Sequence, residues 1–231
     1  MEKGDKRHTS SFLPLVPLTL YPFLSLSLSP FIIPFKKNMT TSVVLVGVGG
    51  QGILLASEIV AQAAMIAGFD VKTNEVHGMA QRGGSVIAQI RFGQKIYSPL
   101  VPKKTACVLG SLERMECLRY LDYLADDGLA VVSSQRIVPV TASSGQVPYP
   151  DIDEVMLLKF FPKLIYLDFV QKAKELGNPK AANTMQIGTM SRRLDLPLDA
   201  WTEAICRSVK PQFVEINIKA FQLGCLLEPV A

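Results

Sequence analysis

The hydrophobic pattern of the chain alternates between short apolar runs and longer stretches in which apolar residues recur every three or four positions. Short runs without polar residues are typical of strands that are buried on both faces of a sheet. Runs of this kind predict strands at residues 43–46 and 106–109, alternation predicts one at 86–92, and further extended segments are expected at residues 71–76, 96–98, 129–133, 137–140 and 164–169. The recurring stretches predict helices, which are expected at residues 53–67, 112–124, 151 onward, 170–176, 181–194, 198–209 and 213–227.

This order of elements predicts an α/β fold, in the form of a Rossmann-like, three-layer domain with a mostly parallel sheet and a helical C-terminal layer. Residues 43–76 read as a β-α-β unit, for which a right-handed crossover is expected. Residues 39–231 show no internal repeat, and one sheet with its helices accounts for every expected element. We therefore interpret residues 39–231 as a single domain.

The first 38 residues differ in kind from the rest of the chain. Residues 12–35 carry no charge and follow a basic stretch, an outline that resembles a signal peptide or a membrane anchor. Prolines interrupt this segment every few residues, and each interior proline costs a helix about 3 kcal/mol. Three interpretations stay open: sequence upstream of a true start at Met39, a poor membrane anchor, or a disordered extension. We favour the first, because a strand is expected soon after Met39.

Composition narrows the class of protein. Apolar residues make up 48% of the chain, which excludes wholesale disorder. Residues 39–231 carry 19 basic and 18 acidic groups, so a dedicated nucleic-acid binder is not expected. The four cysteines are scattered and the chain has two histidines, so no metal site is expected. Scattered thiols are typical of a reducing compartment, and a cytoplasmic protein without a membrane partner is expected.

Residues 47–52 read G-V-G-G-Q-G and lie directly between the first expected strand and the first expected helix. Glycines let a backbone approach a phosphate closely, and the first amides of a helix point toward a bound anion. The alternative is that these glycines only permit tight packing of the strand against the helix. The candidate cofactor-binding residues of this turn are Gly47, Gly49, Gly50, Gln51 and Gly52, with Gln51 adding two side-chain donors.

Residues 75–85 read E-V-H-G-M-A-Q-R-G-G-S and follow the second expected strand. They are expected at the carboxyl edge of the sheet, where open α/β sheets bind ligands. Arg82 offers a forked donor to a carboxylate or phosphate, and His77 can bind, donate or titrate. The alternative is a polar loop with an internal Glu75–Arg82 ion pair. The candidate cofactor-binding residues of this segment are Glu75, His77, Arg82, Gly83 and Gly84.

The turn at 47–52 and the block E-V-H-G-M-A-Q-R-G-G-S-V at 75–86 resemble the gamma-type subunits of 2-oxoacid:ferredoxin oxidoreductases. The resemblance extends from about Met39 to Gly224, and it includes residues 177–181 with Asn183 and residues 217–221. The wider family has a shorter E-M-R-G-G form in the second block. The inserted H-G-M-A-Q therefore favours the branch that acts on indolepyruvate.

The resemblance implies an accessory subunit that has no catalytic residues of its own and is inactive alone. The whole enzyme would decarboxylate an aryl 2-oxoacid oxidatively, form an acyl-CoA and pass electrons to ferredoxin. Thiamine diphosphate and iron–sulfur clusters would belong to a larger alpha subunit, since this chain lacks a G-D-G…N thiamine motif and cysteine clusters. The glycine turn and Arg82 would contact the pyrophosphate of coenzyme A or the alpha subunit.

Two other classes of function stay open at this point. The first is an autonomous NAD(P)-dependent dehydrogenase, in which Glu75 would hold a ribose hydroxyl. The second is a nucleotide-binding regulatory domain, which would use the same glycine turn. The exact 2-oxoacid and the subunit stoichiometry do not follow from the sequence.

Overall fold

The structure is a computed structural model, and it describes residues 40–78, 83–138 and 149–228. Its centre is a six-stranded sheet in the order β2-β3-β1-β4-β5-β6. The strands are β1 (Thr41–Val48), β2 (Asp70–His77), β3 (Ser85–Gly93), β4 (Ala106–Ser111), β5 (Leu124–Ser133) and β6 (Leu164–Leu167). Only β3 runs against the others, since it pairs antiparallel with β1 and β2 while the remaining pairs are parallel. The predicted mostly parallel sheet is confirmed.

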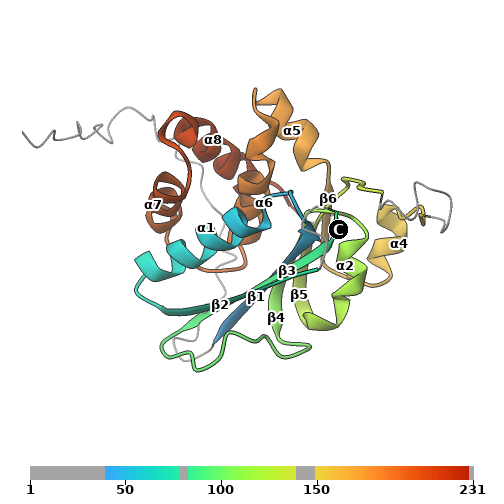
Figure 1. Cartoon of the computed structure of the whole chain (residues 1–231), viewed down its shortest axis with the longest axis horizontal. Coiled ribbons are helices and arrows are strands. Elements are labelled where there is room, and N and C mark those ends of the chain that lie inside the picture. Colours follow the sequence, from blue (N-terminus) through green and yellow to red (C-terminus); the bar gives the residue numbers. More distant parts are fainter. Residues whose placement is uncertain (1–39, 79–82, 139–148, 229–231) are drawn as a thin grey trace, which may run out of the picture. The chain divides into compact units, whose positions relative to one another are not determined.

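Helices cover both faces of this sheet and give three layers (Figure 1). One face carries α1 (Ile53–Ile66), α5 (Phe169–Glu175), α6 (Ala182–Ser191), α7 (Leu198–Ser208) and α8 (Val214–Cys225). The other face carries the shorter helices α2 (Glu116–Arg119) and α4 (Glu154–Leu158). Short 3₁₀ turns lie at η2 (Leu121–Tyr123), η3 (Pro179–Ala181) and η4 (Pro211–Phe213).

The apolar run of β1 explains why helices are needed on both sides. Val43 and Leu45 belong to the core beneath α1, whereas Val44 and Val46 belong to the core beneath α2 and α4. Side chains alternate between the faces of a strand, so a strand that is apolar throughout must be covered on both faces.

The C-terminal helical layer is confirmed, and two glycines determine how closely its helices pack. A Cβ atom at Gly224 of α8 would lie 1.9 Å from the carbonyl oxygen of Met185 in α6. A Cβ atom at Gly188 of α6 would lie 2.1 Å from the carbonyl oxygen of Phe221 in α8. The two backbones are therefore in direct contact, and any side chain at these positions forces the helices apart.

The predicted helix at 112–124 is wrong. The structure places only α2 and η2 in this segment, and β5 begins at Leu124, which lies opposite Ala106 of β4. Apolar residues from Met115 to Leu124 pack in the core beneath α2 and α4, from a short helix, a 3₁₀ turn and the start of a strand, whereas Leu112 belongs to the core beneath α1. Because the apolar residues from Met115 to Leu124 face one core from three short elements, their spacing along the sequence is like that of one long amphipathic helix.

The strand expected at 96–98 is also wrong. Asp70 Oδ2 accepts a hydrogen bond from the amide of Ile96 at 2.8 Å, and Arg91 Nη1 donates to the carbonyl oxygen of Ser98 at 2.9 Å. Side chains of β2 and β3 thus hold this segment in place of a ladder. Of the strand expected at 137–140, the first two residues are irregular, and the last two lie outside the described residues.

Residues 1–39 lie outside the described residues as well, so the interpretations of the N-terminal segment stay predictions. Among the helices of the described residues, none is both long and apolar enough to cross a membrane.

Candidate functional site

The glycine turn lies where the connections that leave neighbouring strands pass to opposite faces of the sheet. The adjacent parallel strands β1 and β4 end at the same edge, and β1 leads into α1 on one face while β4 leads toward α2 on the other. In open α/β sheets, such a switch point leaves a crevice outside the carboxyl ends of the strands, and ligands bind there. The position of the turn therefore favours a binding site.

Glycine is required at several positions of the turn, for different reasons. Gly50 and Gly52 have φ angles of 99° and 83°, which side chains other than glycine rarely adopt. A Cβ atom at Gly52 would also lie 2.7 Å from Nδ2 of Asn183. At Gly47, a Cβ atom would lie 2.8 Å from Oε1 of Gln51. By contrast, nothing lies within 4 Å of a Cβ atom placed on Gly50.

Gln51 holds the turn together and has no spare donors for a ligand. Its Oε1 accepts from the amide of Val48 at 2.7 Å. Its Nε2 donates to the carbonyl oxygen of Leu112 at 2.7 Å and to Oε1 of Gln135 at 2.8 Å. The two donors that the sequence offered are thus used within the protein, which makes Gln51 a positioning residue.

Asn183 of α6 fixes the same turn from the opposite side. Its Nδ2 donates to the carbonyl oxygen of Gln51 at 2.6 Å and to that of Gly52 at 3.3 Å. Asn183 belongs to the C-terminal pattern that carried the family resemblance. The structure shows that its side-chain amide supports the glycine turn, a role that the sequence alone did not indicate.

The two glycine motifs form one surface. The amide of Gly49 donates to the carbonyl oxygen of Gly84 at 2.8 Å, and the amide of Gly83 donates to the carbonyl oxygen of Gly49 at 3.5 Å. We call the residues Gly49, Gly50, Gly83 and Gly84 the glycine surface. Arg82 and the rest of 79–82 lie outside the described residues, so the predicted role of Arg82 and its ion pair with Glu75 stay predictions.

Glu75 lies away from the turn, on the edge strand β2. Strand β3 separates β2 from β1, which puts roughly 10 Å between the two backbones. The Oε1 atom of Glu75 accepts a hydrogen bond from Oγ of Ser57 in α1 at 2.6 Å. This geometry does not favour the ribose contact of a nicotinamide enzyme, in which the acid follows the strand next to β1.

His77 ends β2 and is exposed. It lies opposite Val86 of β3, which in turn lies opposite Gly47 of β1. His77 is therefore in the same row of the sheet as the start of the glycine turn, but it is separated from the turn by one strand.

A buried carboxylate next to the turn was not identified from the sequence. Glu113 is 1% exposed and follows β4. One of its oxygens accepts from the amides of Met115 and Glu116 at 2.7 and 3.2 Å. The other accepts from the amide of Ile137 at 3.3 Å and from the hydroxyl of Tyr149. Glu113 thus joins three segments that are far apart in the sequence.

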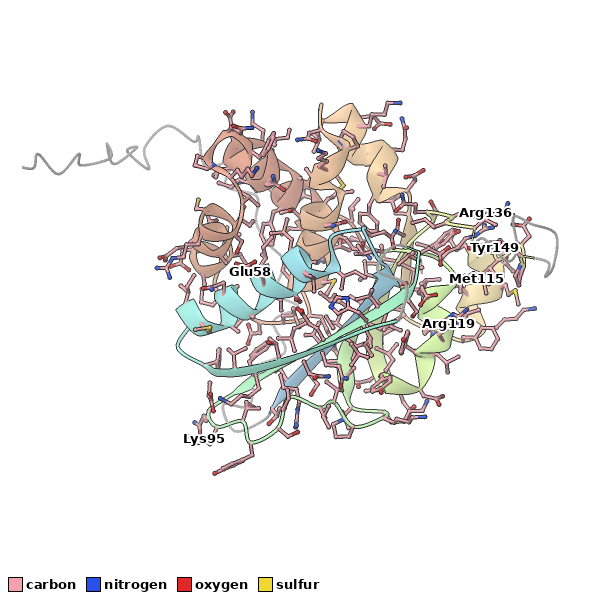
Figure 2. All side chains as sticks on the ribbon, viewed as in Figure 1. Glu58, Lys95, Met115, Arg119, Arg136 and Tyr149 are labelled. Carbon is pink, nitrogen blue, oxygen red and sulfur yellow. The ribbon has the colours of Figure 1, made fainter. Side chains whose placement is uncertain are left out.

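Two arginines lie close to the ring of Tyr149. The guanidinium of Arg136 is 4.6 Å from the centre of its ring and that of Arg114 is 5.5 Å away. Burial, together with the hydrogen bond to Glu113, raises the pKa of Tyr149 to about 12, so the hydroxyl keeps its proton and donates. Figure 2 shows Arg136 and Tyr149 side by side, on the same side of the sheet as Met115 and Arg119.

A second buried carboxylate anchors the segment that contains Gly83 and Gly84. Glu116 accepts from the hydroxyl of Ser85, which directly follows Gly84, and from Nε of Arg119 at 3.1 Å. Burial raises the pKa of Glu116 above its ordinary value, although the hydrogen bond from Ser85 opposes this shift.

The cysteines do not fit an iron–sulfur cluster. They lie on four different elements, namely β4, α2, α7 and α8. Burial raises the pKa of both Cys107 and Cys117, so these thiols keep their protons in the folded chain. Within the described part of the chain, no group of three acids, histidines or cysteines is placed to hold a metal ion.

Comparison with known proteins identifies the family of the chain. The family model described as pyruvate ferredoxin/flavodoxin oxidoreductase matches residues 42–227. Indolepyruvate oxidoreductase subunit IorB of Pyrococcus horikoshii is 42% identical over 188 residues, which cover 79% of this chain and 93% of that protein.

Solved structures share the fold. Pyruvate oxidoreductase subunit PORC of Thermotoga maritima matches with a TM-score of 0.62 at 21% identity, over 83% of this chain and 97% of that one. The 2-oxoglutarate:ferredoxin oxidoreductase of Magnetococcus marinus, solved with 2-oxoglutarate, coenzyme A and succinyl-CoA bound, matches with a TM-score of 0.60 at 19% identity, over 80% of this chain and 30% of that one. The resemblance carried by the two glycine motifs is thus confirmed, and the chain belongs to the pyruvate ferredoxin/flavodoxin oxidoreductase family.

Proposed function

We propose that the chain is the small, gamma-type subunit of an indolepyruvate:ferredoxin oxidoreductase. The observation that carries this proposal is the 42% identity to the Pyrococcus horikoshii subunit over 93% of its length, because it covers nearly the whole relative and not one motif. The inserted H-G-M-A-Q in the second glycine motif supports the same branch of the family.

In this proposal, the assembled enzyme converts an aryl pyruvate and coenzyme A to an arylacetyl-CoA and carbon dioxide. The carbon–carbon bond to the carboxylate breaks and a carbon–sulfur bond to coenzyme A forms. The thiol proton is released, and the two electrons pass to ferredoxin. Thiamine diphosphate and iron–sulfur clusters on a larger alpha subunit supply the carbanion and electron chemistry.

We assign the glycine surface to the pyrophosphate of coenzyme A or to the contact with the alpha subunit. Its place at the switch point supports this assignment. A Cβ atom on Gly50 or on Gly83 would meet nothing within 4 Å, so both backbones are open to an approaching group. Arg82, which lies in the same motif, is assigned to the same contact. We also assign the assembly to the cytoplasm, since all four cysteines are free thiols, which suits a reducing compartment.

The proposal is tested by anaerobic purification of the tagged chain from cells that also express its alpha subunit. A larger iron–sulfur protein is expected to copurify. The complex is expected to reduce ferredoxin with indolepyruvate only when coenzyme A is present, and the isolated chain is expected to be inactive. Turnover by the isolated chain, or a cluster or thiamine held by it alone in stoichiometric amount, would contradict the proposal.

The assignment of Arg82 has a separate test. Arg82→Ala in the assembled enzyme is expected to raise the KM for coenzyme A or to weaken subunit assembly. If both stay at the wild-type value, the assignment is wrong while the membership of the family is unaffected.

A further inference from the structure

Arg136 differs from the other arginines of the described residues in what its guanidinium contacts. Each of the other six donates to a carbonyl oxygen or pairs with a carboxylate, as Arg114 does with Ile152 and Asp151. Arg136 is exposed, and its only contact with the described residues is the ring of Tyr149. No described residue accepts a hydrogen bond from its N–H donors or pairs with its charge, and we take these donors as candidates for binding a ligand.

The backbone that carries Arg136 is attached to the glycine turn. The preceding residue, Gln135, accepts through Oε1 from Nε2 of Gln51 at 2.8 Å. The carbonyl oxygen of Gln135 accepts from the amide of Arg114 at 3.1 Å. Arg136 thus directly follows Gln135, whose side chain contacts the turn, and its backbone lies at the same carboxyl edge of the sheet.

The Tyr149 ring provides a fixed support for this guanidinium. The Tyr149 hydroxyl donates to Glu113, whose remaining hydrogen bonds come from the backbone amides of Met115, Glu116 and Ile137. Because amides and a hydroxyl satisfy the Glu113 carboxylate, Arg136 is not needed to neutralise it. A guanidinium stacked on an aromatic ring keeps its edge free for bidentate hydrogen bonds to a phosphate.

We propose that Arg136, supported by Tyr149, binds a phosphate group of coenzyme A that lies across the glycine surface. This inference rests on the proposed function and adds to it the residue that recognises the anionic part of the ligand. Arg136 supplies the charge and the forked donors, Tyr149 positions the guanidinium, and Glu113 positions Tyr149. A carboxylate of the alpha subunit is the competing partner for Arg136, and the test separates the two.

The test uses the assembled enzyme and compares three acceptors: coenzyme A, 3′-dephospho-coenzyme A and pantetheine. Arg136→Gln is expected to raise the KM for coenzyme A by roughly tenfold or more, because hydrogen bonds between charged groups contribute that much to binding. The kcat and the KM for indolepyruvate should stay at the wild-type values, and the KM for pantetheine, which has no phosphate, should not change. Arg136→Lys should recover part of the loss, since it keeps the charge but not the fork.

Two further variants test the positioning role of Tyr149. Tyr149→Leu removes the ring and is expected to raise the KM for coenzyme A but not for pantetheine. Tyr149→Phe keeps the ring and loses the hydroxyl that contacts Glu113 and Arg114, so its effect should be smaller. The matched control is Arg207→Gln on α7, an exposed arginine that pairs with Glu203 and should leave all three KM values unchanged.

The outcomes distinguish the inference from the proposed function. An equal rise in KM for coenzyme A and pantetheine, or weaker subunit assembly with an unchanged KM for coenzyme A, would overturn the role of Arg136 in phosphate binding. If Arg82→Ala raises the KM for coenzyme A and Arg136→Gln does not, this inference fails while the proposed function stands. If the wild-type complex does not need coenzyme A to oxidise indolepyruvate, the proposed function itself fails.

Discussion

The two faces of the sheet differ in the side chains that are buried against them. On the face of α1 and the C-terminal helices, apolar side chains and two glycines allow α6 and α8 to pack backbone against backbone. On the face of α2 and α4, short helices enclose two buried carboxylates, Glu113 and Glu116. The first face is organised mainly for packing, with Asn183 reaching from it to the glycine turn, whereas the second uses buried carboxylates to hold loops at the edge where ligands bind. Substitutions on the two faces should therefore change different properties.

The largest effect is expected on the packed face. Gly224→Ala puts a methyl group where the Met185 carbonyl oxygen lies, so α6 and α8 must separate, and the free energy of unfolding should fall by about 3 kcal/mol or more. Urea denaturation followed by circular dichroism measures this loss. Gln222→Ala, on the exposed side of the same helix, should change stability by less than about 0.5 kcal/mol. Equal stability of Gly224→Ala and wild type would disprove the backbone contact.

A smaller loss is expected on the polar face. Glu113→Gln replaces a carboxylate that accepts four hydrogen bonds with an amide that has one acceptor oxygen, and should cost about 2–3 kcal/mol. Unlike Gly224→Ala, it should also raise the KM for coenzyme A in the assembled enzyme, because Tyr149 loses its anchor. Glu58→Gln is the matched control, since Glu58 is an exposed carboxylate on α1 (Figure 2). A KM unchanged by Glu113→Gln would separate Glu113 from the site.

The glycine turn is contacted from both faces of the sheet, and removal of one of its hydrogen bonds should lower stability less than the two substitutions above. Asn183→Ala removes the donor to the carbonyl oxygens of Gln51 and Gly52, and a loss of about 1 kcal/mol is expected. Hydrogen exchange of the amides at 49–52 should become faster while exchange in β4 and β5 is unchanged. If protection is lost evenly over the sheet, Asn183 supports the fold as a whole and not the turn.

The smallest effect concerns the pH dependence of the polar face. Burial raises the pKa of Glu116, so the folded chain binds this proton more tightly than the unfolded chain does. Its favourable contribution is therefore complete below the ordinary carboxyl pKa and is lost as the pH rises through the higher pKa of the folded state. Glu116→Gln should gain stability relative to wild type between pH 4 and pH 7. Parallel urea midpoints of the two proteins across this range would contradict the shift.

The sequence was sufficient for the features that depend on local pattern. The apolar run of β1, the glycine turn and the C-terminal helices with prolines at their boundaries were all predicted from neighbouring residues. The sequence was not sufficient where distant segments decide the structure. Strand β3 lies between β1 and β2 because of how the strands pair, and the sequence of one strand does not encode its partners. This position of β3 separates Glu75 from the turn.

The polar network was missed for the same reason. Glu113 lay inside a predicted helix, where an acid usually faces solvent, and its partners Ile137 and Tyr149 follow 24 and 36 residues later. Arg136 and Tyr149 carry no motif. Their relation becomes visible only when the fold brings the ends of β4 and β5 side by side, and Figure 2 shows Arg136 next to Tyr149.

Main-chain hydrogen bonds close the base of the second glycine motif, because the amide of Gly78 donates to the carbonyl oxygen of Ser85 at 3.0 Å and Gly84 accepts from Gly49. Such a closure does not depend on which side chains stand between its ends. These main-chain hydrogen bonds thus fix the end of the register between β2 and β3.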